Sequence, residues 1–228
     1  MSDANQSPEH PPWLSIWVSP RSTVRQVVRS DPRYGYPVLA SIWGASIALS
    51  LSSAFYLGEK LPLATILIGA LIGGALGLPA LYLLAVLYTK MGRVFGGRSS
   101  ATDMRAALAW SAVPQIPILL VWILRIALFG QSTFTSIGYS NSAQLVPPLI
   151  FSLVQLASLP FSIWGIAIWI GAYAEVHQVS TWRGIASLAA GGAFIGAALA
   201  AVGVVCLPVS FILYAILRML ILPMQSAG

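Results

Sequence analysis

Apolar stretches as long as a lipid bilayer is thick set the strongest limit on how this chain can fold. The clearest stretch covers residues 37–57 and contains no charged side chain. A helix rises about 1.5 Å per residue, so about 20 apolar residues cross a hydrocarbon core about 30 Å thick. Charged residues make up only 8% of the chain, whereas a soluble domain carries about 25%. The sequence therefore predicts an all-α, polytopic membrane helical bundle.

Short polar connections divide the apolar sequence into five predicted spans. Residues 58–61 form a tight turn, and the uncharged polar residues 130–146 form a loop on the same side of the membrane. Residues 184–224 exceed one bilayer width but contain no polar turn, so a sixth span over 208–222 stays open as an alternative. The predicted membrane domain covers residues 34–224, with spans at about 37–57, 62–88, 104–129, 147–173 and 185–207.

Residues 1–33 precede the first span and lack the basic and apolar regions of a signal peptide. We expect a cytoplasmic tail with a short amphipathic helix, because Ser19 can cap a helix that has Pro20 at its first position. One face of this helix carries Val24, Val27 and Val28, and another carries Arg21, Arg25 and Arg29. Two interpretations follow: a helix in the headgroup region bound to anionic lipid, or a solvated helix packed on the bundle.

Basic residues are distributed unevenly between the two sides of this topology. With the N-terminus in the cytoplasm, nine basic residues lie in cytoplasmic segments, and Lys60 alone lies in an external turn. The positive-inside rule therefore predicts a cytoplasmic N-terminus, and five spans then place the C-terminus outside. The hairpin over residues 78–117, with its Gly96–Gly97 turn, carries four of the nine. The nine are Arg21, Arg25, Arg29, Arg33, Lys90, Arg93, Arg98, Arg105 and Arg183.

Glycines at four-residue spacing indicate close helix packing. Gly69, Gly73 and Gly77 share one face of the second predicted span, and Gly192 and Gly196 repeat the spacing in the fifth. A face without side chains lets a neighbouring backbone approach closely. These glycines lie inside apolar helices rather than between a strand and a helix, which argues against a phosphate-binding loop.

Three polar residues lie inside the predicted spans. Gln115 and Gln155 lie at similar depths on antiparallel helices, so they could meet near the bilayer midplane and, with nearby prolines, line a small polar cavity. The alternative is an ordinary interhelical hydrogen bond worth about 1 kcal/mol. Arg125 lies one turn from the external end of its span, where snorkelling to the interface is easier than burial.

The chain contains few side chains that could act in catalysis. The chain has six carboxylates and two histidines, and it contains no H-E-x-x-H, C-x-x-C or G-x-S-x-G motif. Glu175 and His177 could form a proton relay or half of a metal site, but such a pair more often ends a helix. We therefore predict no catalytic residue, no metal and no cofactor. No aromatic platform or recognition helix accompanies the arginines, which argues against nucleic acid as the partner.

Several segments resemble the bacterial branch of the Yip family, the Ypt/Rab-interacting membrane proteins with a five-span domain. They are PWLSIWVSP at residues 12–20, the entry Asp31-Pro32-Arg33-Tyr34, and LYLLAVLYTKMGRVFGG followed by AALAWSAVPQIP. Eukaryotic relatives carry a D-L-Y-G-P motif and are implicated in binding prenylated small GTPases; here extra residues separate the corresponding positions. The resemblance therefore implies a fold and a bacterial inner-membrane address rather than an activity.

The predicted function is that of a non-enzymatic membrane protein that organises or recruits other components. Its cytoplasmic face would bind anionic headgroups or an unidentified membrane or cytoplasmic protein through Arg21, Arg25, Arg29, Arg93 and Arg98. The chain could also form homo-oligomers. The alternative is a small-solute transporter or channel subunit that uses the Gln115 and Gln155 cluster. The sequence shows no charged residue at mid-bilayer and no internal repeat, which argues against transport.

Overall fold

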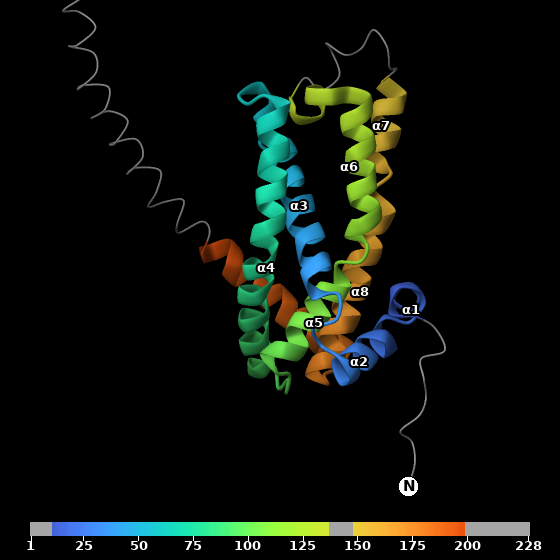
Figure 1. Cartoon of the computed structure of the whole chain (residues 1–228). Helices are drawn as coiled ribbons and strands as arrows, with labels where there is room; N and C mark the ends of the chain where they lie inside the picture. Colours follow the sequence, from blue (N-terminus) through green and yellow to red (C-terminus); the bar gives the residue numbers. More distant parts are fainter. Residues whose placement is uncertain (1–10, 137–147, 199–228) are drawn as a thin grey trace, which may run out of the picture. The chain divides into compact units, whose positions relative to one another are not determined.

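The computed structural model describes residues 11–136 and 148–198, and the chain divides into two compact units between Ser187 and Leu188. Over these described residues the fold is all-α (Figure 1). A further helix covers residues 181–198. The labelled elements are α1 (Pro12–Val18), α2 (Pro20–Ser30), α3 (Tyr36–Ala54), η1 (Leu57–Glu59), α4 (Leu63–Val94), α5 (Ala101–Ser111), α6 (Gln115–Phe129), η2 (Gly130–Phe134), α7 (Pro148–Leu156) and α8 (Leu159–His177).

Four segments of the described chain are long and apolar enough to cross a membrane. They are Tyr36–Ala54, Leu63–Val94, Gln115–Phe134 and Ser152–His177. The predicted fifth span, 185–207, extends past the described residues, and the alternative sixth span over 208–222 lies outside them. The polytopic all-α class is therefore confirmed, whereas the number five stays a prediction.

The third predicted span, 104–129, is wrong as one continuous helix. The chain turns at Ala112–Pro114, where the backbone N–H of Val113 donates to the carbonyl oxygen of Trp110 at 3.3 Å. Pro114 has no N–H to donate and disfavours helical geometry at the residue before it, so the helix ends there. Helix α5 is capped by Ser100 and Asp103, and the crossing segment begins only at α6.

The helix ends also differ from their predicted positions. Helix α4 continues to Val94, six residues past the predicted end of the second span, and keeps Pro79 inside it. The fourth predicted span is divided into α7 and α8 near Pro160, and α8 continues to His177. These extensions carry the helices beyond one bilayer width towards the connecting segments.

Small residues join α3 to α4, which lie side by side in Figure 1. A Cβ atom added at Gly77 would overlap the carbonyl oxygen of Ala40, and one at Gly73 would lie 2.5 Å from the Cβ of Ala48. A Cβ at Gly69 meets nothing within 4 Å. Gly73 and Gly77 thus lie against α3, whereas Gly69 has no such neighbour. The counterpart of Gly73 and Gly77 on α3 is Gly44, where an added Cβ would overlap the carbonyl oxygen of Gly73.

The two other predicted packing glycines, Gly192 and Gly196, lie in the second unit. Their role in helix packing stays a prediction.

Candidate functional site

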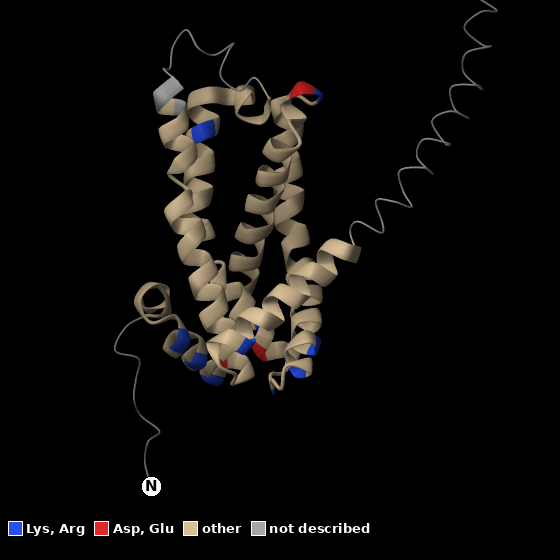
Figure 2. Cartoon of the chain, turned by 180° about the vertical axis from the view of Figure 1, so that it is seen from behind, with Lys and Arg blue, Asp and Glu red and all other residues tan. Residues whose placement is uncertain are grey.

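Most of the lysine and arginine residues lie at one end of the first unit, which we call the basic end (Figure 2). It contains α1, α2, α5 and the adjoining ends of α4 and α8. All five arginines predicted to face lipid or a partner belong to it and are exposed: Arg21, Arg25, Arg29, Arg93 and Arg98. At the opposite end, which we call the turn end, η1 and η2 connect the helices.

Helices α1 and α2 are held on the basic end by their apolar faces. Ile16, Val24 and Val27 are each at most 2% exposed and share a core with Trp110 and Ile168. Helix α2 thus buries its valine face against other helices and leaves its arginines outside. This packing agrees with the interpretation of α2 as a helix packed on the bundle.

Trp110 of α5 joins the N-terminal region to the bundle. Its indole Nε1 donates to the carbonyl oxygen of Tyr34 at 3.1 Å. Its ring centroid lies 4.9 Å from that of Trp13 and 5.9 Å from that of Tyr34. Because α5 turns away at Ala112, Trp110 can face α1 rather than lipid.

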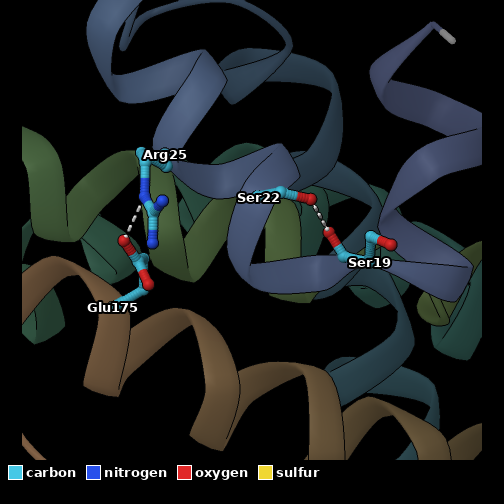
Figure 3. A network of polar contacts seen from close by, with 4 residues as sticks. All are labelled: Ser19, Ser22, Arg25 and Glu175. Atoms are coloured by element: carbon cyan, nitrogen blue, oxygen red, sulfur yellow. Dashed lines mark hydrogen bonds and ion pairs between the residues drawn. The ribbon is translucent and has the colours of Figure 1, made fainter. Parts of the chain in front are cut away.

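Polar contacts of α2 with α8 and with Thr181, the first residue of the helix after α8, border a groove of about 500 Å³. The Nε of Arg25 donates to the Glu175 carboxylate at 2.6 Å, as Figure 3 shows, and the Arg21 guanidinium donates to the hydroxyl of Thr181 at 2.7 Å. The hydrogen bond and the charge of Glu175 raise the pKa of Arg25. The lining is completed by Ser19, Pro20, Ser22, Ala167, Ile170 and Gly171.

His177, at the end of α8, is fully buried under the connection between α4 and α5. Its Nε2 lies 3.2 Å from the hydroxyl of Ser99, and a Cβ at Gly92 or Gly97 would overlap its ring. Glu175 instead pairs with an arginine of α2. The two side chains that the sequence suggested as a relay or half a metal site therefore have separate partners.

Arg125 is buried near the turn end, so the predicted snorkelling is wrong. Its side chain is 6% exposed, and its guanidinium carbon lies 4.2 Å from the ring centroid of Trp122. Its Nε has no hydrogen-bond partner among the described residues. Helical side chains tilt towards the N-terminus of their helix. On α6 that direction leads from Arg125 towards Trp122, away from the end of the helix at Phe129.

Gln115 and Gln155 do not form the predicted midplane pair. Gln115 is the first residue of α6 and lies next to Pro114, whose Cβ would be 3.5 Å from a Cβ at Gly165. Gly165 is ten residues along the chain from Gln155 and belongs to α8, whereas Gln155 belongs to α7. No hydrogen bond joins the two amides within the described segments. The depth predicted for Gln115 assumed a helix that began at 104, and the turn at Ala112–Pro114 removes that assumption.

Sequence reasoning missed the contacts that depend on distant segments. Glu175 pairs with Arg25, which is 150 positions away in the chain, and no local spacing indicates that pair. Gly92 and Gly97 were visible beside the basic hairpin, and a small residue at a helix end is a signal for close packing. What packs there, the His177 ring, comes from another helix.

Comparison with known proteins finds one family. A family model described as the Yip1 domain matches residues 14–203. No curated protein and no solved structure matches the chain. The matched range contains α2 to α8 in full and all the residues that line the groove.

Proposed function

This chain belongs to the Yip1 domain family, and from that premise we propose that it organises or recruits membrane components at its basic end. In this proposal the basic end faces the cytoplasm of a bacterial inner membrane, and the protein has no enzymatic activity. Anionic headgroups, or an acidic surface of a partner protein, are what the basic end attracts. Near a membrane surface each basic residue contributes on the order of 1 kcal/mol to such attraction.

The observation that carries the proposal is the availability of the cations at the basic end. Arg29, Arg93 and Arg98 are exposed, and their side chains form no hydrogen bond or ion pair with other described residues. An exposed cation without an internal partner keeps its charge available to an outside anion. The buried Arg125 at the turn end covers a tryptophan ring instead.

Helix α1 supports a position of the basic end at the membrane interface. Leu14 is 65% exposed and Val18 is 82% exposed. They are four residues apart and so lie on one face of the helix. An apolar face beside a row of arginines is the pattern of a segment that lies along the headgroup boundary.

The described carboxylates support a role without catalysis, because each accepts a hydrogen bond from another residue of the fold. Asp31 accepts from the N–H of Arg33, and Asp103 accepts from the N–H of Ser100 as a helix cap. Glu59 accepts from Ser136, and Glu175 accepts from Arg25.

Quenching of tryptophan fluorescence by brominated lipids tests the proposal. The full chain is reconstituted in vesicles of brominated phosphatidylglycerol or of brominated phosphatidylcholine, and the relative lipid affinity is measured at low and high salt. We expect a preference for the anionic lipid that falls with salt, since the Debye length shortens from about 10 Å at 0.1 M to about 3 Å at 1 M.

The triple variant Arg29→Gln, Arg93→Gln, Arg98→Gln should lose most of that preference and keep its helical circular dichroism. Equal quenching of the parent chain by the two lipids at low salt would overturn the proposal for lipid. If the parent and the triple variant captured an acidic partner protein equally well, these arginines would have no role in binding it.

A further inference from the structure

We infer that the groove between α2 and α8 binds a single anionic phospholipid, with its phosphate at Arg21 and one acyl chain along α8. The groove has a volume of about 500 Å³, and its lining places Arg21 and Arg25 beside the apolar residues Ala167 and Ile170. This inference rests on the proposed function, because it needs the basic end at the headgroup level. It replaces a diffuse attraction by one site with defined residues.

The charges of the groove match one phosphodiester. Arg25 is offset by Glu175 at 2.6 Å, whereas Arg21 donates to the neutral hydroxyl of Thr181. Two cations and one carboxylate leave a net charge of about +1, and a phosphodiester carries about one negative charge. The Thr181 hydroxyl accepts from Arg21 and so keeps its own proton to donate to a phosphate oxygen.

The first turn of α2 adds backbone donors at the same place. The N–H groups in the first turn of a helix have no partner within the helix. Arg21 and Ser22 belong to that turn and line the groove, and Ser19 makes no side-chain cap bond. Free amides at a helix N-terminus favour phosphate. They act together with the guanidinium of Arg21 rather than alone.

The floor of the groove favours a lipid over a soluble anion. Ala167 and Ile170 belong to the candidate span Ser152–His177. With Ile163 and Ile166 they follow the spacing i, i+3, i+4 and i+7, which defines one face of a helix. Ile163 is 60% exposed and Ile166 is 56% exposed. This apolar stripe leads from the groove towards the middle of the span, as an acyl chain would. A free phosphate or an acidic peptide has no acyl chain to bury along it.

Native mass spectrometry of the full chain in detergent, with phosphatidylglycerol added, tests the site. We expect one bound phosphatidylglycerol at concentrations where phosphatidylcholine does not bind. Arg21→Gln should weaken this binding about tenfold, as expected for loss of a charge-assisted contact. The matched control is Arg29→Gln, which removes the same charge from the same helix outside the groove and should weaken binding about twofold at most.

A second variant tests the floor without changing the charge. Ala167→Phe fills the groove at an exposed position and should also reduce binding, with an unchanged melting temperature in detergent. Arg21→Lys should restore part of the affinity lost in Arg21→Gln, which separates the charge from any effect of that change on folding. Glycerol phosphate, which has the headgroup chemistry but no acyl chain, should compete weakly.

The outcomes distinguish this inference from the proposed function. Equal losses in Arg21→Gln and Arg29→Gln, with several lipids bound, would overturn the single site and leave the basic end as a diffuse surface. Strong competition by glycerol phosphate would overturn the acyl chain on α8. Failure of the parent to prefer phosphatidylglycerol would overturn both.

Discussion

The basic end and the turn end of the first unit are built on different principles. At the basic end, α1, α2, α5 and α8 bury a core around Trp110, and the arginines stay on its surface. At the turn end, η1 and η2 are joined by hydrogen bonds, such as that from Gln131 to the carbonyl oxygen of Gly58 at 2.7 Å. Of the two described cations near the turn end, Lys60 is exposed in the turn and Arg125 is buried. An exposed cation is available for recognition, whereas a buried one belongs to the packing.

The largest expected effect concerns the sides of the membrane on which the two ends lie. We expect a reporter fused after Gly97, at the basic end, to be cytoplasmic and one fused after Lys60, at the turn end, to be external. The reason is the excess of basic residues at the first of these ends. Activity of alkaline phosphatase and fluorescence of a green fluorescent protein at the two positions measure this, and the reverse pattern would break the comparison outright.

Gly77→Leu should give the next largest effect, because it separates the helix pair that connects the two ends. A side chain there would overlap the backbone of Ala40, and overpacking of this kind costs about 3 kcal/mol. Unfolding in mixed detergent micelles measures the loss. Gly69→Leu is the matched control, since a Cβ there meets nothing within 4 Å. Equal stability of the two variants would contradict the observed contact.

Arg125→Met sharpens the contrast between buried and exposed cations. Replacing a buried charge by an apolar side chain of similar size is often neutral or stabilising, by about 1 kcal/mol or more. We therefore expect equal or higher stability in detergent, with lipid preference unchanged. A marked loss of stability would show that Arg125 has an anionic partner in the membrane, and the turn end would then also hold a functional cation.

The smallest effect is a pH dependence at the turn end. Hydrogen bonds from the side chain and the backbone of Ser136 lower the pKa of Glu59. A lowered folded-state pKa stabilises the protein above the unfolded pKa of about 4.3, and that contribution is lost as the pH falls through the folded value. Glu59→Gln should therefore be less stable than the parent near pH 6, and the difference should shrink below pH 4. A constant difference over this range would exclude the ionised carboxylate as its source.

The sequence predicted many of the residues that form the candidate site, but not their positions relative to one another. The arginines of α2 were identified from their four-residue spacing, because helical periodicity is a local property. The burial of Arg125 was not, although the tilt of helical side chains was a usable signal. Gln115 and Gln155 were placed together only because a turn between α5 and α6 was not expected, despite Pro114 and Pro117.

The sequence by itself determined that this chain is all-α, that it spans a membrane several times, and that its cations concentrate at one end. These properties follow from composition and from periodicity, which act over one or two helical turns and a bilayer width. Only the tertiary structure decided that Glu175 meets Arg25, that His177 fills the space above Gly92, and that α2 and α8 border a groove. Such contacts depend on how whole helices are placed against each other, and no local pattern in this chain specifies that placement.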